Sequence, residues 1–430
     1  VGKAKIFPPV RPPSDIKVGV ISDSPRITTG FGVVTKMVVE GLLENKFQVS
    51  CLGMYDYDPN PSRYKRDPCK IWRGCPNCNQ STLTHLARFL QSEKPDILYI
   101  NYDPGNVYNI MRSLEEQKWD SPIIAYFPVE AVPLQTTYGD MIKAVWLKGG
   151  VPITYTKWAA ERIKEQFGMS VEVAPHGVEH AEFKPLSPEE RSTLRYAVGF
   201  EGKFVVASMG RNKRVKGMPV LLDAIELLVK AGHEDIVAYL HTNPDEQNQL
   251  GSYPLRDMVK QRKLEGKIFF PPDLSSQIRG VPYDGLIEIQ TRETESIDEA
   301  RAVNMMGLNL AQRLGCADLY IDCSQAEGWG MPSTESAMCG TPVIAVRDGV
   351  REEVWGEMDY IEPVGYDTWH TAGKLPIIDP KDVANRILYY KSHPRELLIL
   401  SDQCRTQAQK WSWKVLQNLV SYYASTLVNR

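Results

Sequence analysis

Two glutamates stand eight positions apart in AEGWGMPSTESAMC, residues 326–339. Glu327 lies in a loop that contains glycine and tryptophan, and Glu335 lies in the segment that follows it. That segment has Pro332 near its start and Gly340 just after its end. Because proline suits the first turn of a helix and glycine its carboxyl end, we expect a short helix that begins at Pro332. Glu327 would then precede the helix, with Glu335 about one turn inside it.

The amino end of this expected helix suits an anion, because its first N–H groups are unpaired and its dipole is positive there. Carboxylates are also good acceptors for the vicinal hydroxyls of a sugar. Glu327 and Glu335 could therefore hold two polyols on either side of a bound phosphate. The alternative is that both glutamates only stabilise the start of the helix by interacting with its dipole.

A second candidate is the segment SMGRNKRVKGMPV, residues 208–220. We expect a strand to end at Gly210 and a helix to open at Gly217, so that Arg211 and Lys216 project from the connecting loop. Arginine offers a forked set of donors and lysine a mobile point charge, and together they suit a diphosphate. The alternative is a solvated basic loop.

A third candidate is SDSPRITTGFGVVTKMV, residues 22–38, between the first expected strand and helix. Gly30 and Gly32 would let the backbone approach a ligand closely. The segment lacks the third glycine of a dinucleotide-binding fingerprint, which argues against a nicotinamide-dependent oxidoreductase. A purely structural turn is the alternative for both glycines.

Strands must place these three loops at one edge of a sheet. Short apolar runs alternate with helical segments along the chain, which predicts an α/β protein with parallel sheets. A polar, proline-containing stretch at 176–190 reads as a linker between two such series. We expect an N-terminal lobe over 1–180, a C-terminal lobe over 181–411, and a final helix at 412–430 that packs back on the first lobe. Ligands of open parallel sheets bind at the carboxyl ends of the strands, here in a cleft between the lobes.

The composition sets limits on the class of protein. The 430 residues carry 50 basic and 53 acidic side chains, and this balance argues against a nucleic-acid-binding protein. No window of the sequence reaches the ~18 consecutive apolar residues of a transmembrane helix, and the first residues lack the apolar core of a secretory signal. We therefore expect a cytoplasmic protein.

Taken together, the three segments resemble the retaining GT-B glycosyltransferases that carry an E-x7-E motif. EGWGMPSTE fits that motif from Glu327 to Glu335, and GRNKRVKG fits the G-R-x4-K-G phosphate loop. APHGVEHAEFKP fits the linker pattern P-x-G-V-[DE]-x-x-x-F. The resemblance covers most of the chain and is most specific between residues 174 and 345. It implies the GT-B fold, in which two Rossmann-like lobes face each other across a cleft.

The resemblance also implies roles for individual residues. Glu335 would bind the ribose of a nucleotide, Glu327 would contact the donor sugar, and Arg211 with Lys216 would neutralise the diphosphate without a metal ion. The backbone at the helix start and the glycine loop of the first lobe would add contacts to the bound sugar nucleotide. This second group comprises Gly210, Gly330, Met331, Pro332, Ser333, Gly30 and Gly32.

Three further residues carry open alternatives. Many members of the family have a histidine after the strand that corresponds to PIIAYF, and this chain has Glu130 near that place. Glu130 would hold a sugar hydroxyl or orient the acceptor, or it is a solvated loop acid. His241 would line the nucleotide pocket, or it is an ordinary polar loop residue. His176 falls in the linker, where we expect no chemical role.

The cysteines of DPCKIWRGCPNCNQ leave a structural zinc as an alternative. Cys69, Cys75 and Cys78 include one C-x2-C pair, with His85 nearby, but a second pair is absent. We expect free cysteines and no zinc. We also expect the long polar segment 273–300 to be a loop, because it exceeds usual connections.

The sequence thus predicts a metal-independent retaining hexosyltransferase. Its donor would be a nucleotide-diphosphate sugar, UDP- or GDP-linked, and its acceptor a hydroxyl of a glycan or another molecule. We expect no cofactor, no nucleic acid and no transmembrane segment. The alternative is a non-catalytic protein of the same fold that binds nucleotide sugars or glycans.

Overall fold

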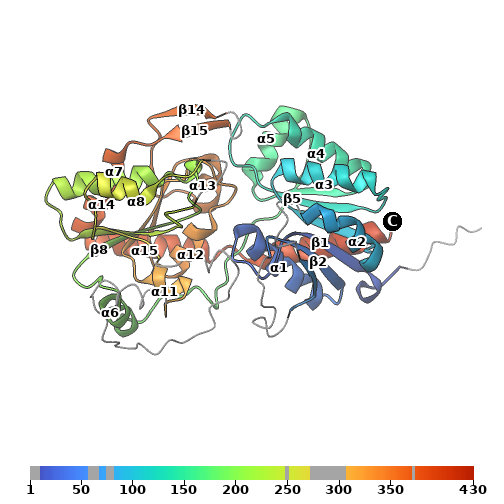
Figure 1. Ribbon diagram of the computed structural model, residues 1–430, viewed down its shortest axis with the longest axis horizontal. Helices are drawn as coiled ribbons and strands as arrows, with labels where there is room; N and C mark the ends of the chain where they lie inside the picture. Colours follow the sequence, from blue (N-terminus) through green and yellow to red (C-terminus); the bar gives the residue numbers. More distant parts are fainter. Residues whose placement is uncertain (1–9, 57–66, 74–81, 247–250, 272–306, 370–372) are drawn as a thin grey trace, which may run out of the picture.

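A computed structural model describes residues 10–56, 67–73, 82–246, 251–271, 307–369 and 373–430. Two parallel sheets form two lobes that lie side by side (Figure 1). The first sheet has the strand order β3-β2-β1-β4-β5-β6-β7 and the second has β10-β9-β8-β11-β12-β13. Both orders follow the doubly wound pattern, in which the chain reverses direction across the sheet beside its first strand. The predicted fold of two Rossmann-like lobes is confirmed.

The first lobe is built from apolar strands that are buried on both faces. Its strands are β1 (Lys17–Asp23), β2 (Gln48–Met54), β3 (Lys70–Arg73), β4 (Ile97–Asn101), β5 (Ile123–Phe127), β6 (Val151–Thr154) and β7 (Glu172–Val173). Its helices are η1 (Pro13–Asp15), α1 (Gly30–Glu44), η3 (Thr82–His85), α2 (Leu86–Glu93), α3 (Pro104–Glu116), α4 (Thr136–Leu147) and α5 (Lys157–Phe167). One apolar cluster joins the sheet to α2 through α5 and another joins it to α1, so helices cover both faces.

The second lobe repeats this arrangement. Its strands are β8 (Phe204–Met209), β9 (Ile236–His241), β10 (Ile268–Phe269), β11 (Leu319–Asp322), β12 (Val343–Val346) and β13 (Tyr360–Ile361). Its helices are α6 (Pro188–Ala197), η4 (Arg214–Lys216), α7 (Met218–Lys230), α8 (Leu255–Gln261), α11 (Leu310–Gly315), α12 (Met331–Met338), α13 (Gly349–Trp355), α14 (Pro380–Ser392) and α15 (Pro394–Ala408). A separate antiparallel hairpin, β14 (Gly365–Trp369) and β15 (Gly373–Ile377), leaves this lobe after β13.

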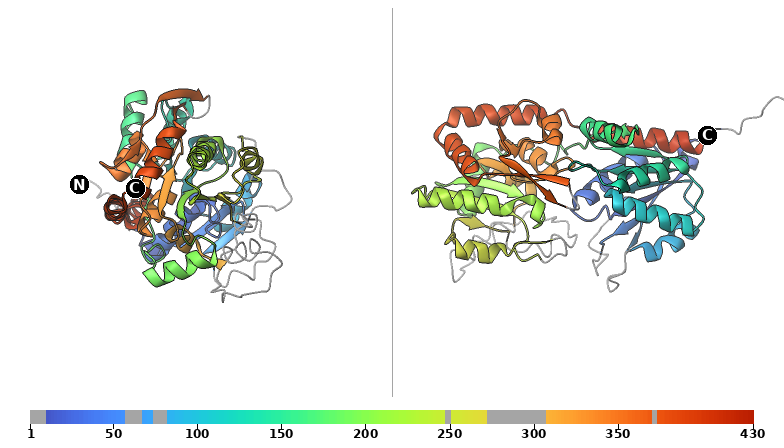
Figure 2. Two further views of the ribbon diagram at one scale, coloured as in Figure 1. Left: turned by 90° about the vertical axis from the view of Figure 1, so that its left-hand side faces the viewer. Right: turned by 90° about the horizontal axis from the view of Figure 1, so that it is seen from above.

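The last helix, α16 (Trp413–Val428), returns to the first lobe, where it packs against α1, β4 and β5. Figure 2 (right) shows it, in red, along one edge of the first lobe and ending at the C-terminus. Gln417 donates a hydrogen bond to the carbonyl of Met37 at 2.7 Å, and its side chain fills the space beside Gly41. In the described part of the chain, no helix is both long and apolar enough to span a bilayer.

Several sequence-based boundaries need correction. The predicted linker 176–190 already contains the start of α6, where Ser187 and Glu190 form a capping box. Strand β3 was missed because it lies within the cysteine-containing segment, where turn residues obscure its short apolar run. Helix α12 begins at Met331 rather than Pro332, with Gly330 at a φ of 91° as its N-cap. The predicted loop 273–300 lies outside the described residues.

Candidate active site

The predicted donor-site loops leave two adjacent strands. β8 pairs with β11, so the loop that follows β8 and the loop that follows β11 meet at the reversal point of the second sheet. The first loop carries Arg211 and Lys216, and the second carries Glu327. This crevice is where doubly wound sheets bind ligands. The tertiary structure therefore brings these three residues, 116 positions apart at most in the chain, to one place.

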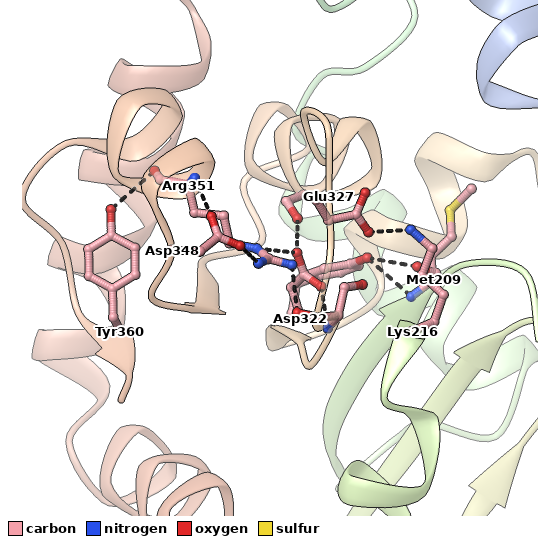
Figure 3. Close-up of polar contacts among 10 residues, drawn as sticks. Met209, Lys216, Asp322, Glu327, Asp348, Arg351 and Tyr360 are labelled. Carbon is pink, nitrogen blue, oxygen red and sulfur yellow. Dashed lines mark hydrogen bonds and ion pairs between the residues drawn. The ribbon is translucent and has the colours of Figure 1, made fainter. Parts of the chain in front are cut away.

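Lys216 and Glu327 form a direct ion pair at this point (Figure 3). Both side chains are largely buried, with 20% and 14% of their surface exposed. Burial lowers the pKa of Lys216, but the carboxylates of Glu327 and Glu130 raise it above its usual value. Lys216 therefore stays charged at the floor of the crevice.

Arg211 is exposed and is held by an acid of its own lobe. Its Nε donates to Glu246 at 3.1 Å, and the backbone N–H of Asn212 donates to the same carboxylate at 3.2 Å. Glu246 follows β9, the other neighbour of β8. Arg211 is thus oriented at the mouth of the crevice, where a charged ligand can reach it.

A buried charge network behind Glu327 was not predicted from the sequence. Arg351 of α13 is 1% exposed and forms ion pairs with Asp322, at 3.2 Å, and with Asp348 (Figure 3). It also donates to the carbonyl of Ser324 at 2.8 Å. Asp322 ends β11 and accepts from the Ser333 hydroxyl at 3.2 Å. The network therefore ties the end of β11, the start of α12 and the start of α13 into one rigid unit.

The amino end of α12 offers fewer backbone donors than predicted. Pro332 has no N–H, and the N–H of Ser333 donates to the Gly330 carbonyl at 3.1 Å. Of the three predicted amides, that of Met331 is left to face a ligand. The physical reason is that Pro332 has no N–H and the tight turn at Gly330 uses that of Ser333.

Glu335 has surroundings that differ from those of Glu327. It is 9% exposed and sits beside Glu182 of the interlobe segment. Burial, and then the charge of Glu182, raise the pKa of Glu335 to about 8. Glu327 and Glu335 therefore occupy different electrostatic environments, and Glu335 is largely protonated at neutral pH.

The glycines of the first lobe lie inside the first turn of α1. A Cβ on Gly30 would lie 3.4 Å from the Met331 side chain, so this turn faces the start of α12 across the cleft. A Cβ on Gly32 would lie 2.2 Å from the Ile27 carbonyl oxygen. Gly32 is therefore required by its own turn, which is the structural alternative raised for it above.

Glu130 belongs to a group of charges that face each other across the cleft. Burial, and then the charge of Asp103, raise the pKa of Glu130 to about 7, and Lys216 opposes this shift. Lys213 has a lowered pKa, first because of burial and then because of Arg211. Glu130 reaches solvent, yet its carboxylate responds to charges of both lobes.

The sequence reading missed Asp103 and Lys213, and also Asp23. Asp23 ends β1 and accepts from the Tyr102 hydroxyl at 2.6 Å. Burial raises the pKa of Asp23, although hydrogen bonds from Thr29 and Tyr102 oppose the shift. The available signal was positional, since Asp23, Asp103 and Lys213 each lie at or just after the carboxyl end of a strand that flanks a reversal point.

The two histidines differ in their surroundings. The Nδ1 of His241 lies 2.8 Å from the Tyr239 hydroxyl, and its carbonyl accepts from the Gly210 N–H at 3.2 Å. His241 therefore adjoins the start of the Arg211 loop. His176 is 4% exposed and is enclosed by aromatic rings, including Trp329 of the Glu327 loop. In the part of the chain that the structure describes, neither of its ring nitrogens has a partner.

For the cysteine segment, Cys69 is partly buried and has a free thiol. Burial, and then the charge of Asp67, raise the pKa of this thiol to about 12. Cys75 and Cys78 lie outside the described residues. Among the described residues, no group of three or more histidine, cysteine or acidic side chains is arranged to hold a metal ion.

Several solved structures share this architecture. Anabaena HepE in complex with UDP-glucose superimposes with a TM-score of 0.67, over 95% of this chain and 98% of that one, at 14% identity. Sucrose-phosphate synthase from Thermosynechococcus elongatus superimposes with a TM-score of 0.66, over 95% of this chain and 98% of that one, at 16% identity. This chain has the GT-B fold. The resemblance to GT-B glycosyltransferases that the motifs indicated is confirmed.

The GT-B chain also has a sequence relative among curated proteins. It is 26% identical over 193 residues to mannosylfructose-phosphate synthase from Agrobacterium fabrum. The match covers 43% of this chain and 35% of that protein, so it spans about a third of the relative's length. No family model matches the sequence.

Proposed function

We propose that this GT-B chain transfers a hexose from a nucleotide-diphosphate sugar to an acceptor hydroxyl, with retention of configuration and without a metal ion. The observation that carries the proposal is the Lys216–Glu327 ion pair at the reversal point of the second sheet. It sets a fixed cation beside a carboxylate at the place where such sheets bind ligands. HepE, which shares the fold, binds UDP-glucose, and we extend that donor class to this chain.

The cations suit the charge that develops during transfer. Breaking a sugar–phosphate bond builds negative charge on the leaving diphosphate and positive charge on the anomeric carbon. Lys216 and Arg211, with the Met331 amide, would stabilise the diphosphate in place of a metal ion. Glu327 would then bind sugar hydroxyls near the anomeric carbon, released in part from Lys216 as the diphosphate takes over that cation.

The remaining residues divide between the two ends of the donor and the acceptor. Glu335, protonated at neutral pH, would bind the ribose hydroxyls as both donor and acceptor. His241 would border the nucleotide beside Gly210. On the opposite lobe, Glu130 would orient the acceptor, with Gly30 near the donor phosphates. Residues 1–180 with the last helix would thus form the acceptor lobe, and residues 181–411 the donor lobe.

Retention follows from where the acceptor proton can go. If the acceptor attacks from the face that the diphosphate leaves, a diphosphate oxygen can accept its proton as the new bond forms. No enzyme carboxylate then needs to act as a nucleophile.

A donor screen followed by a transfer assay tests the proposal. UDP-, GDP- and ADP-sugars would be screened by thermal shift, because a ligand raises the melting temperature according to its affinity. Donor hydrolysis and transfer would then be measured with EDTA present, and the anomeric configuration of the product read by NMR. Donor binding without turnover would instead indicate a non-catalytic nucleotide-sugar-binding protein. Inversion, or loss of activity in EDTA, would contradict the proposed mechanism.

A further inference from the structure

The hairpin β14–β15 is not part of either lobe's sheet. Within the described residues its two strands pair with each other alone, over five residue pairs from Gly365–Ile377 to Trp369–Gly373. Figure 1 shows it above the second lobe, with its far end directed toward α5 of the first lobe. A two-stranded hairpin is marginally stable by itself, so contacts with the rest of the protein must hold it in place.

One set of contacts connects the hairpin to the loops that carry Lys216 and Glu327. The side-chain amide of Gln325 donates to the Pro376 carbonyl of β15 at 2.8 Å. The backbone N–H of Gln325 donates to the Val215 carbonyl at 2.6 Å. Gln325 is two residues before Glu327 and Val215 is one residue before Lys216. The hairpin is therefore linked to both donor-site loops through Gln325, and Asp367 of β14 adds an ion pair to Arg214 of the Lys216 loop at 3.6 Å.

A second contact crosses to the other lobe. The backbone N–H of Lys374 donates to the Val132 carbonyl at 2.8 Å. Next to it, Gly373 has a φ of 84°, and a Cβ there would lie 2.8 Å from the Val132 oxygen and 2.9 Å from the Val132 carbonyl carbon. Glycine is thus needed at 373 both for its conformation and for the close approach of the two backbones.

Val132 belongs to the segment that carries Glu130. The far end of this segment is held by α5, where the Gln166 side chain accepts from the Leu134 N–H at 2.8 Å and donates back to the Leu134 carbonyl. Val129, beside Glu130, is fully buried. Glu130 therefore lies between the end of β5 and two anchors, Val132 held by the hairpin and Leu134 held by α5.

We propose that the β14–β15 hairpin is a positioning element that sets Glu130 against the donor site, with Gly373 as its essential contact. The inference rests on the proposed function, since it assigns Glu130 to the acceptor. The hairpin joins the segment 128–134 to the Gln325–Glu327 loop, so one rigid element sets the separation between acceptor and donor groups. Loss of the contact at Val132 weakens acceptor binding and leaves the nucleotide site unchanged.

The test uses Gly373→Ala in the full chain, with Gly365→Ala as the matched control. Gly365 lies at the other end of the same hairpin, where a Cβ would meet only the Ile377 side chain at 3.6 Å. We expect Gly373→Ala to raise the acceptor KM about tenfold, the effect of one lost interaction. It should also increase donor hydrolysis relative to transfer. UDP affinity should stay within about twofold of wild type, a change well under one such interaction.

A second variant and a second readout make the outcome decisive. Lys374→Pro removes the N–H that donates to Val132 and covers the case in which Gly373→Ala does not fold. Hydrogen exchange of the 128–134 amides needs no substrate, and it should speed up in Gly373→Ala but not in Gly365→Ala. Glu130→Ala should raise the acceptor KM similarly, and the double variant should add little. Unchanged exchange and acceptor KM in Gly373→Ala would overturn the inference, whereas failure of the wild type to bind any sugar nucleotide of the screen contradicts the proposed function.

Discussion

Glu327 and Lys216 are paired across two loops that leave neighbouring strands, β11 and β8. The pair joins the two motifs that the sequence placed more than a hundred positions apart. Before a donor binds, Glu327 is the partner that Lys216 holds. A bound diphosphate would compete with Glu327 for Lys216, so binding of a donor would weaken this ion pair.

Lys216→Ala should slow transfer about 10²- to 10³-fold, the usual loss when one donor to a developing charge is removed from an enzyme. The substitution also leaves Glu327 as an uncompensated carboxylate near the incoming diphosphate. Steady-state rates with the donor found by the screen provide the measurement. Lys230→Ala is the control, because Lys230 is exposed and pairs only within α7. Wild-type rates in Lys216→Ala would contradict the proposed role.

Glu335 should make the protein less stable as the pH rises. The folded state holds a proton on Glu335 up to about pH 8, whereas an unfolded glutamate releases it near its ordinary value of 4.5. Between these limits the folded state binds more protons, so the free energy of unfolding falls by up to about 1.4 kcal/mol per pH unit from this group.

Urea unfolding at several pH values between 5 and 8 measures this slope. In Glu335→Gln the free energy of unfolding should decrease less with rising pH, because glutamine keeps the shape of a protonated glutamate and does not ionise. The same variant should be at least as stable as the wild type at pH 8. An unfolding free energy that rises over this range in the wild type, relative to Glu335→Gln, would show that Glu335 is ionised in the folded protein.

Arg351→Met should destabilise the second lobe by about 3–5 kcal/mol, since it leaves the buried Asp322 and the half-buried Asp348 without their shared cation. Arg347→Ala is a suitable comparison, because Arg347 pairs with two exposed glutamates and should cost at most about 1 kcal/mol. Chemical denaturation of both variants measures the difference. Similar small losses in the two would mean that the network is more hydrated than its burial indicates.

His176→Phe should leave the melting temperature unchanged or raise it. His176 stacks on Tyr155 with ring centroids 4.2 Å apart and also contacts Trp329 and Trp413. Burial lowers its pKa to about 3, so it is neutral in the folded state. Phenylalanine keeps the ring packing and removes two buried nitrogens, an exchange that is close to neutral or stabilising.

His176→Ala is the opposite case, because it opens a cavity between rings of both lobes. It should cost about 3–5 kcal/mol, as for other large aromatic truncations. Differential scanning calorimetry of both variants gives the comparison. A clear loss of stability in His176→Phe would show that the histidine nitrogens are hydrogen-bonded in the folded protein.

The order of strands and helices was largely readable from the sequence, because buried parallel strands are short apolar runs and the helices between them keep a 3.6-residue period. The runs at 16–22, 47–53 and 203–210 correspond to β1, β2 and β8 to within one residue at each end. The hairpin β14–β15 and the short strand β3 were not predicted. Their sequences alternate little, and they are stabilised by contacts with distant parts of the chain.

Motif spacing, together with the resemblance to GT-B glycosyltransferases, identified Arg211, Lys216, Glu327 and Glu335 as candidates and implied the fold that the comparisons support. It placed the two glutamates as a pair around one helix end. The tertiary structure gave them different environments, because burial beside Glu182 raises the pKa of Glu335 while Lys216 pairs with Glu327.

Only the tertiary structure decided which charges meet. No local pattern connects the segments that supply Arg351 and its two aspartates. The same holds for the segments that supply Glu130, Asp103 and Lys213. Their neighbours are set by strand order and by the approach of one lobe to the other, both of which are long-range. A sequence determines residue types and local periodicity, whereas pKa values and ion pairs depend on distances and burial that exist only after the chain has folded.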